Sequence, residues 1–415
     1  MSVNNVIGRR AAGRPRVPGR SRPGSMAAGW LLAALGVACT PGGQELRVPA
    51  GAGAMLPRLT GGETPLLSWV EPAGTGHRLM FAEFGGNDWG MAREVAAGSD
   101  WFVNWADFPS VERLGDGRLA AHWLQKEGTA PYAYGVRISQ TDNDGSWSPA
   151  VTPHDDGTPT EHGFVSLFPV GTALGVVWLD GRNMAADPPG GMTLRAARIR
   201  PDGRISAAWE IDALTCDCCQ TGAAAGPMGA VVVYRDRSEH EVRDIYASVL
   251  GPEGWSSPAR VAADGWRIDG CPVNGPAVAA SGSLVVTGWF TAADGPTRVR
   301  AAISRNGGYR FEQAMDLSEG PVLGRVDVAA LPGGRAAVSW VAAGHGKADG
   351  SSGARLRYRV IGASGPGPVQ DVAYLEGSRA AGFPQMAATA DRLIFAWTET
   401  GAGGPGIRSL AVRLP

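Results

Sequence analysis

The chain has 415 residues, of which 44% are hydrophobic and 19% charged, with 61 glycines and 30 prolines. These values are ordinary for a globular protein and exclude a disordered chain, a coiled coil and a collagen-like fibre. The formal net charge is -1, yet residues 1–38 carry six arginines and no acidic residue. The remainder is therefore acidic and is not expected to bind nucleic acid.

The N-terminal region has the features of an export signal. Residues 9–25 are rich in arginine, proline and glycine, and residues 26–38 form an apolar run that is too short to span a bilayer. A buried core helix is the alternative interpretation of this run. The arginine-rich leader and the polar residues that follow the run favour a signal peptide over residues 1–38.

The segment Gly36-Val37-Ala38-Cys39 resembles the lipobox of bacterial lipoproteins, in which the cysteine is acylated and becomes the mature N-terminus. The family normally has leucine where this chain has Gly36, so simple secretion is the alternative to lipidation. The resemblance implies that a lipid anchor at Cys39 is the contact with the membrane. Thr40, in place of the aspartate that retains such proteins at the inner membrane, implies an outer-membrane lipoprotein that faces the periplasm or the cell surface.

A short apolar segment that ends in an aromatic residue recurs seven times along the rest of the chain. The copies lie about 55 residues apart and end at Trp69, Trp123, Trp178, Tyr234, Trp289, Trp340 and Trp397. A regular interval of this length is typical of a repeat architecture in which each copy is one structural unit. Each copy is preceded by a turn and, before that, by a second run of small residues.

The residues after each aromatic segment predict two further strands. The clearest is 355–360, in which charged and apolar residues alternate as in a half-buried strand. Four strands per unit predict an all-β, seven-bladed β-propeller over residues 44–415, joined to the signal by a linker at 39–43. The last unit has only three strands, so we expect residues 44–48 to supply its outer strand and close the ring.

Two turns in these units resemble the Asp-box of sialidase-like propellers, which are also called bacterial neuraminidase repeats. The turn at 304–311 has the form Ser-x-Asn-x-Gly-x-x-Phe, and the turn at 141–147 is one residue shorter. Glycine permits a positive φ, and the Asp or Asn side chain caps the turn. The resemblance covers about residues 44–415, implies a sialidase-like fold, and assigns these turns a structural role.

The loops that lead into the inner strands of a propeller share one face with the loops between the second and third strands, around a central channel. Residues 101–108 place four aromatic side chains in one such loop. These side chains either plug the channel or form a ligand platform. In the second case, Trp101 and Trp105 would stack on a ring, with Asn104 and Asp107 as hydrogen-bonding groups.

The loops between the second and third strands carry charged residues of both signs. Asp180 and Arg182 lie in one of them, and Arg235 and Asp236 begin another. A solvated network of ion pairs is one interpretation. The alternative is a ligand site in which the arginines bind a carboxylate through paired hydrogen bonds.

Four cysteines lie in two loops of adjacent blades. Cys216, Cys218 and Cys219 precede the inner strand of blade four, and Cys271 precedes that of blade five. An even set in an exported protein predicts two disulfides of undetermined connectivity. The alternative is a copper or zinc site, because soft thiolates suit Cu(I) and Zn(II), with His162 or His240 as additional ligands.

The resemblance to sialidases implies an arginine triad, a tyrosine nucleophile paired with a glutamate, and an aspartate acid. The family's Arg-Ile-Pro motif has no counterpart in the mature chain. Candidates for each of these roles can nevertheless be chosen by residue type, although their spacing in the sequence does not show that they lie together. They are Arg182, Arg235, Arg325 and Arg379 for the triad, Tyr374 with Glu376 for the nucleophile, and Asp107 for the acid.

We therefore expect a monomeric, lipid-anchored propeller of the cell envelope that binds a carbohydrate or protein ligand without catalysis. The first alternative is an exo-α-sialidase. The second is a periplasmic metal or redox protein that uses the cysteine cluster.

Lipidation predicts that Cys39→Ser moves the protein from the membrane fraction to a soluble one, because the acylated residue is lost. Fractionation followed by immunoblotting measures this, with Cys271→Ser as the control that should remain in the membrane fraction. Membrane association that is unchanged in Cys39→Ser would contradict a lipid anchor at this residue.

Overall fold

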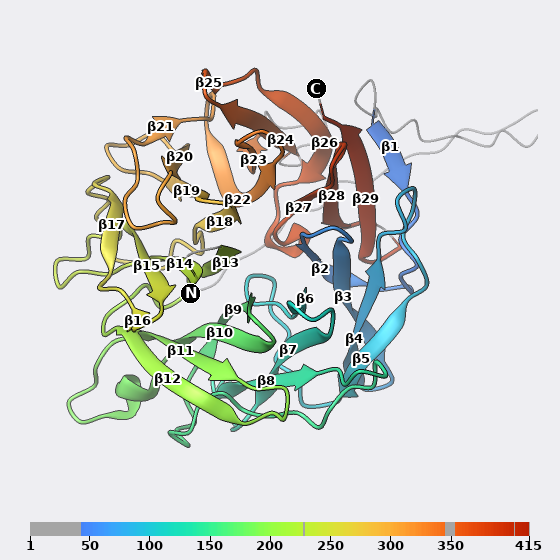
Figure 1. Cartoon of the computed structure of the whole chain (residues 1–415), viewed down its shortest axis with the longest axis vertical. Coiled ribbons are helices and arrows are strands. Elements are labelled where there is room, and N and C mark those ends of the chain that lie inside the picture. Colours follow the sequence, from blue (N-terminus) through green and yellow to red (C-terminus); the bar gives the residue numbers. More distant parts are fainter. Residues whose placement is uncertain (1–42, 227–228, 345–352, 402, 415) are drawn as a thin grey trace, which may run out of the picture. The chain divides into compact units, whose positions relative to one another are not determined.

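The computed structural model describes residues 43–226, 229–344, 353–401 and 403–414. These residues form seven antiparallel sheets that are arranged around a central axis as the blades of a propeller (Figure 1). The prediction of an all-β, seven-bladed propeller is confirmed. The export signal and Cys39 lie outside the described residues. Within the described ranges, no helix is both long and apolar enough to cross a membrane.

Each blade begins at the channel with its inner strand. Blade one contains β2 (Met55–Thr60), β3 (Leu66–Ala73), β4 (Gly76–Glu83) and β5 (Arg93–Gly98). Blade two contains β6 (Ser110–Arg113), β7 (Leu119–Lys126) and β8 (Tyr134–Gln140). Blade three contains β9 (His162–Val170), β10 (Ala173–Asp180), β11 (Thr193–Ile199) and β12 (Ile205–Asp212).

The next two blades have short or divided outer strands. Blade four contains β13 (Gly222–Gly226), β14 (Gly229–Arg235), β15 (Ile245–Gly251), β16 (Gly254–Trp255) and β17 (Ala259–Ala262). Blade five contains β18 (Ala277–Ser281), β19 (Leu284–Thr291), β20 (Arg298–Ser304) and β21 (Met315–Asp316).

The last two blades complete the ring. Blade six contains β22 (Val322–Leu331), β23 (Arg335–Ala343), β24 (Gly353–Gly362), β25 (Gly365–Pro366) and β26 (Gln370–Glu376). Blade seven contains β27 (Gln385–Ala388), β28 (Arg392–Glu399) and β29 (Gly406–Arg413), with β1 (Gly43–Leu46) as its outer strand. Two 3-10 helices, η1 (Arg182–Ala185) and η2 (Arg379–Ala381), lie in loops.

The N-terminal strand closes the ring as predicted. β1 pairs with β29 in an antiparallel register that runs from Gly43 opposite Val412 to Leu46 opposite Ser409. The two ends of the described chain therefore belong to one sheet, side by side (Figure 1). This pairing covers the edge of β29, which would otherwise expose unpaired backbone groups.

Blade two departs from the expectation of four strands in each unit. It has three strands, and the segment after β8 forms isolated bridges, such as the one between Ile138 and Val151, in place of a fourth strand. Pro149 and Pro153 flank Val151. Because proline cannot donate a backbone hydrogen bond, this segment does not extend into a regular edge strand.

The recurring aromatic residue lies on the second strand of every blade and is buried in all seven. Its exposed fraction is 0% for Trp69, Trp289 and Trp340, and no more than 7% for Trp123, Trp178, Tyr234 and Trp397. Trp178, for example, packs with Leu124, Val136 and Ile138 of blade two. The other six likewise pack against the preceding blade, and Trp69 of blade one packs against blade seven.

Polar partners satisfy the buried indole groups of three blades. The Nε1 atoms of Trp69, Trp178 and Trp289 donate to Glu71 at 2.7 Å, to Asp180 at 2.8 Å and to Asp264 at 2.7 Å, respectively. Each of these carboxylates also binds an arginine, namely Arg78, Arg182 or Arg300. A buried indole N–H that lacked such an acceptor would cost the free energy of an unmade hydrogen bond.

The two turns that resemble the Asp-box are capped by side chains. Asn306 Oδ1 accepts from the backbone N–H of Arg310 at 3.0 Å, and Gly308 in the same turn has a φ of 98°. Asp142 Oδ1 accepts from the backbone N–H groups of Asp144 and Ser146, both at 2.9 Å. These bonds replace the strand ladder at the point where the chain reverses.

Replacing Trp178 with Ala removes an indole that is 2% exposed and lies between blades two and three. We expect the free energy of unfolding to fall by roughly 3 to 5 kcal/mol, as for other large-to-small changes in a core. Urea unfolding measures this. Trp209→Ala, on the outer strand β12, is the matched control and should cost much less, because that indole is only half-buried. Equal losses in the two variants would contradict the role assigned to the buried aromatic.

Candidate functional site at the channel mouth

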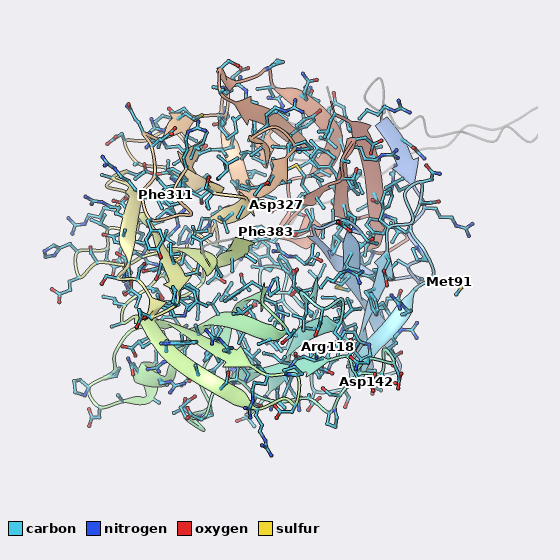
Figure 2. The ribbon with its side chains drawn as sticks, in the orientation of Figure 1. Met91, Arg118, Asp142, Phe311, Asp327 and Phe383 are labelled. Atoms are coloured by element: carbon cyan, nitrogen blue, oxygen red, sulfur yellow. A yellow bond between two sulfur atoms is a disulfide. The ribbon has the colours of Figure 1, made fainter. Side chains whose placement is uncertain are left out.

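The loops that lead into the inner strands meet at one end of the central channel, which we call the channel mouth. It is formed by residues 99–109, 152–161, 213–221, 263–276 and 377–384. Figure 2 places Phe383, from the last of these loops, near the centre of the ring. The mouth is thus built by loops from at least five blades, as expected for the site of a propeller.

Aromatic and amide side chains fill the mouth. Phe383 stacks on Trp105, with ring centroids 5.7 Å apart, and also packs against Phe108 at 6.0 Å. Gln220 donates from Nε2 to the carbonyl of Ala106 at 2.7 Å and accepts from the backbone N–H of Gly275 at 3.0 Å. These contacts join loops of blades two, four, five and seven and plug the channel.

Most of the side chains that were expected to form a ligand platform make contacts within the fold instead. Trp101 is 5% exposed and stacks on Trp123 at 5.7 Å. Asn104 Oδ1 accepts from the N–H of Ala106 at 2.9 Å within its own loop. Asp107 is 2% exposed, whereas Asn104 and Trp105 are half-buried, so Trp105 is the aromatic member of the platform that keeps exposed surface.

Two arginines flank Trp105. The guanidinium carbon atoms of Arg325, from β22, and Arg379, from η2, each lie 5.6 Å from the centre of the same indole ring. Arg325 donates from Nη2 to the carbonyl of Ser378 at 2.8 Å, while its buried Nη1 has no hydrogen-bond partner. Burial lowers the pKa of Arg325 to about 10, so it remains charged at neutral pH. In the part of the chain that the structure describes, neither guanidinium is paired with a carboxylate.

The other two arginines proposed for the triad are occupied within the fold. Arg182 binds both oxygens of Asp180, at 2.8 and 2.9 Å, and reaches Asp156 at 3.2 Å. Arg235 is 2% exposed and donates to the backbone carbonyls of Asn274, Phe290 and Arg243. The structure therefore brings Arg325 and Arg379 together but does not join Arg182 or Arg235 to them.

Asp180 and Asp236, which lie close to these two arginines in the sequence, are also held by contacts within the fold. Asp180 and Arg182 form the ion-pair network that was one interpretation of their loop. The N–H of Asp236 donates to the carbonyl of Asp244 at 3.0 Å, and burial raises the pKa of the Asp236 carboxyl to about 6. These residues shape the loops around the mouth.

The tyrosine and glutamate proposed as a nucleophile pair lie elsewhere in the fold. Tyr374 and Glu376 are on β26, the outermost strand of blade six. Tyr374 is 60% exposed and packs against the guanidinium of Arg355, while Glu376 accepts from the hydroxyl of Thr400. Asp107 lies in a loop at the channel, so the structure does not assemble this pair with the proposed acid. The hypothesis was built from residue types alone, and the sequence does not say on which strand each falls.

Sequence reasoning missed a cluster of Tyr134, Asp107 and Glu161. The hydroxyl of Tyr134 lies 2.9 Å from Asp107 Oδ2 and 2.7 Å from Glu161 Oε1. Burial is the main cause that raises the pKa of each carboxyl to about 7. One hydroxyl hydrogen can serve only one acceptor, so the short contacts to both carboxyls require that one of them is protonated. No spacing in the sequence marks this cluster, because its members come from three separate loops and strands.

Asp107 and Tyr134 are closely packed, whereas Glu161 is half-buried. A Cβ atom added at Gly163 would lie 2.0 Å from Asp107 Oδ2, so only glycine fits there. The Tyr134 ring stacks on Phe102 at 3.9 Å and is 1% exposed. The cavity beside Asp107 measures only about 30 Å³, about the volume of one water molecule.

A second polar cluster lies between blades two and three. The rings of His154 and His162 stack at 3.9 Å, and His162 Nε2 lies 3.1 Å from Asp156 and 3.7 Å from Asp180. Asp156, His162 and Asp180 have the donor types of a metal site, as do Glu127, His154 and His162. The guanidinium of Arg182 already supplies a positive charge to both aspartates, so this network is satisfied without a cation.

The four cysteines form two disulfides. Cys216 pairs with Cys219, and Cys218 pairs with Cys271, with Cα atoms 5.8 and 6.0 Å apart. The second bridge joins the loops of blades four and five, as their equivalent positions predicted. A disulfide sulfur is not a thiolate, so this oxidised pairing supports the disulfide interpretation over a copper or zinc site. His240 is exposed, and neither it nor His162 belongs to a metal-binding group with the cysteines.

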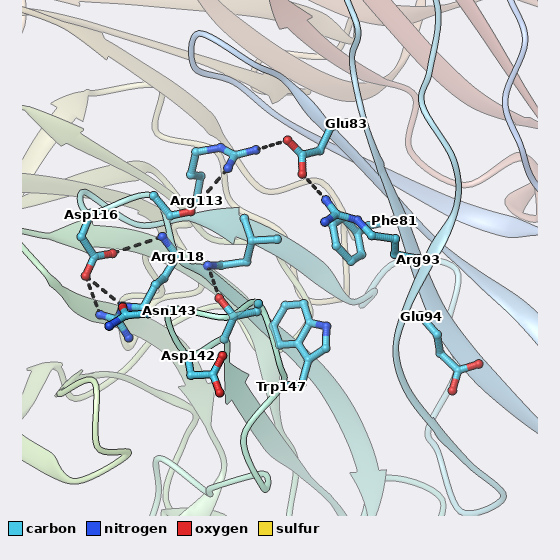
Figure 3. Close-up of a pocket in the computed structure, with 14 residues that line it drawn as sticks. Phe81, Glu83, Arg93, Glu94, Arg113, Asp116, Arg118, Asp142, Asn143 and Trp147 are labelled. Atoms are coloured by element: carbon cyan, nitrogen blue, oxygen red, sulfur yellow. Dashed lines mark hydrogen bonds and ion pairs between the residues drawn. The ribbon is translucent and has the colours of Figure 1, made fainter.

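Two larger cavities lie away from the mouth. A cleft of about 420 Å³ lies beside the short edge of blade two, lined by Phe81, Trp147 and several charged residues. Figure 3 shows that Arg93 and Arg113 both point to Glu83, and that Arg118 binds Asp116. The three arginines of this cleft are therefore paired with carboxylates of its own lining.

The other cavity is the wide end of the channel, with a volume of about 930 Å³. Small side chains of the inner strands line most of it, together with Arg58, Glu112 and Asp327. Arg58 donates to Gln385 Oε1 at 2.8 Å, and Asp327 accepts from the N–H groups of Val328 and Met386. Arg58 and Asp327 thus each join the inner strand of their own blade to β27 of blade seven.

Comparisons with known proteins bear on the fold. No family model matches the sequence, and the curated proteins contain no match to it. Among solved structures, the polysaccharide lyase Uly1 aligns with a TM-score of 0.50 at 9% identity over 89% of this chain and 91% of the lyase. At so low an identity, the similarity shows the propeller fold alone.

Two solved sialidases align less closely. The endosialidase of phage phi92 gives a TM-score of 0.49 at 9% identity, over 90% of this chain and 69% of the phage protein. The Trypanosoma rangeli sialidase, in complex with the inhibitor DANA, gives 0.43 at 12% identity over 78% of this chain and 56% of the sialidase.

The buried carboxyl cluster predicts a stability that depends on pH. Because Asp107 has a raised pKa in the folded protein, the folded state holds a proton that the unfolded chain releases near pH 4. Stability should therefore fall as the pH rises from about 4 to about 7, by up to about 1.4 kcal/mol per pH unit for one group. Asp107→Asn should flatten this fall, because the amide does not titrate.

Thermal melting across this pH range compares Asp107→Asn with the parent protein. The control is Asp269→Asn, which removes an exposed carboxyl and should leave the slope unchanged. A slope that is the same in Asp107→Asn and the parent would show that Asp107 does not hold the proton.

Proposed function

We propose that the protein is a noncatalytic binding protein of the cell envelope, and that its channel mouth binds a carboxylate-bearing ligand of the acidic-sugar class. The observation that carries this proposal is the pair of guanidinium groups beside Trp105. Arg325 and Arg379 both lie within 5.6 Å of the ring centre, and neither is paired with a carboxylate in the described ranges.

The chemistry of these three side chains matches such a ligand. A guanidinium binds a carboxylate through two parallel hydrogen bonds, and an indole packs against the apolar face of a sugar ring. The buried Nη1 of Arg325 has no partner in the structure. Arg325 is 6% exposed, so a ligand would contact the exposed Arg379 and the half-buried Trp105, with the charge of Arg325 beside the same ring.

The arrangement of the remaining groups supports binding without catalysis. A hydrolase needs an acid and a nucleophile that can reach the substrate. Tyr134 and Asp107 are buried and bound to each other, and Phe383 and Gln220 fill the channel mouth by their contacts with Trp105 and Ala106. A ligand at Trp105 would therefore rest on the plug.

The sequence supports a location at the cell envelope. A lipid anchor at Cys39 would hold the propeller at the membrane, with the outer membrane favoured by Thr40. We propose a monomer, because the pairing of β1 with β29 closes the ring within one chain.

Calorimetric titration with N-acetylneuraminic acid and glucuronic acid tests the proposed site. Arg379→Gln should weaken binding at least about tenfold, since a charge-assisted hydrogen bond contributes roughly 1.5 to 3 kcal/mol. Arg379 is exposed, so this variant should fold normally, and Arg310→Gln is the matched exposed control that should bind as the parent does. The methyl esters of the two sugars, which lack the carboxylate, should bind poorly to all variants.

Two results would contradict the proposal. Equal affinity of Arg379→Gln and the parent would place the ligand elsewhere. Hydrolysis of a fluorogenic sialoside by the purified protein, abolished in Tyr134→Phe, would show a catalytic function instead.

A further inference from the structure

The two disulfides lie unusually close to each other. The sulfur atoms of Cys216, Cys218 and Cys219 all lie within 4.8 Å of one another, although Cys218 is bonded to Cys271 and the other two are bonded together. A thiolate formed at Cys218 would therefore be in contact with the neighbouring disulfide. Thiol–disulfide exchange requires this approach of a thiolate to a disulfide sulfur.

The two bonds differ in their access to solvent. Cys271 is exposed and Cys218 is half-buried, whereas Cys216 and Cys219 are 0% and 2% exposed. An external thiol can reach the sulfur of Cys271 but not the buried pair. The first exchange step should therefore take place at the Cys218–Cys271 bond.

A positive charge lies beside the buried bond. Arg243 donates from Nη1 to the sulfur of Cys216 at 3.4 Å, and Glu241 holds its Nη2 at 2.8 Å. The backbone N–H of Cys216 is bonded to the carbonyl of Arg235 at 3.0 Å, which fixes this end of the loop. A guanidinium next to a sulfur stabilises its thiolate, so Cys216 is prepared to leave when the buried bond is attacked.

We propose that these four cysteines form a thiol–disulfide exchange site for a small-molecule thiol, in which Cys218 passes the electron pair from the exposed bond to the buried bond. This activity is separate from ligand binding at Trp105.

The exchange balances in three steps. A thiolate of the small molecule attacks the Cys271 sulfur, which forms a mixed disulfide and releases Cys218 as a thiolate. Cys218 then attacks the buried disulfide, forms a bond with one of its sulfurs and releases the other, which takes up a proton. A second molecule of thiol cleaves the mixed disulfide. Two molecules of the small thiol are thereby oxidised to one disulfide. The protein gains two electrons and two protons, which it holds as the thiol of Cys271 and the thiol released from the buried disulfide.

Mapping of the free thiols tests this transfer. The oxidised full chain carrying Cys39→Ser, which removes the fifth cysteine, is treated with excess reduced glutathione for short times and quenched with acid. Free thiols are then alkylated and the peptides analysed by mass spectrometry. Among molecules that carry two free thiols, we expect label on Cys271 together with Cys216 or Cys219, at a level at least equal to that on Cys218.

The control is the same chain with Cys216→Ser and Cys219→Ser, in which the exposed bond has no neighbour. There the label must fall on Cys218 and Cys271. The same pattern in the parent, with label confined to Cys218 and Cys271 while the buried pair stays oxidised, would overturn the proposal. The parent result decides the question even if the control fails to fold.

Discussion

Packing of one aromatic side chain against the preceding blade is the interaction on which the whole structure depends. Trp178 is buried only because blade two lies against blade three, and the same holds for each of the other six aromatic residues. No blade can bury its aromatic residue alone, as in other repeat architectures. The ring must therefore close, and β1 makes this possible because it completes blade seven, on which Trp69 of blade one packs.

The same packing places indole N–H groups in the interior, and in blades one, three and five carboxylates accept from them. The carboxylate that accepts from the indole of Trp69 or Trp178 binds an arginine as well, so each buried charge is compensated. In this way, arginines of several blades are paired with carboxylates inside the fold. Within the described residues, Arg235 and Arg58 lack a carboxylate partner, like the two arginines beside Trp105, but donate to backbone carbonyls and to a glutamine side chain. The two arginines beside Trp105 differ from these in lying against the same half-buried indole ring.

The loops of the channel mouth close the channel but leave part of one aromatic side chain exposed. Phe383 and Gln220 close the channel by contacts between blades that are distant in the sequence, and they leave Trp105 at the surface. Gln220 directly follows Cys219, so the disulfides brace the same loop that supplies the plug. The mouth is thus held by covalent bonds on one side and by aromatic stacking on the other, which favours a rigid surface for binding.

The sequence alone determined the number of blades, the strand that closes the ring and the two loops that bring the cysteines together. These features follow from local signals, since period-two alternation, turn residues and a regular interval specify strands and their order. Only the tertiary structure decided the pairing of Cys218 with Cys271, the internal use of Arg182 and Arg235, and the meeting of Tyr134, Asp107 and Glu161. Whether a charged side chain is free or paired depends on which loops of other blades lie beside it, and that contact is not encoded in the spacing of residues along the chain.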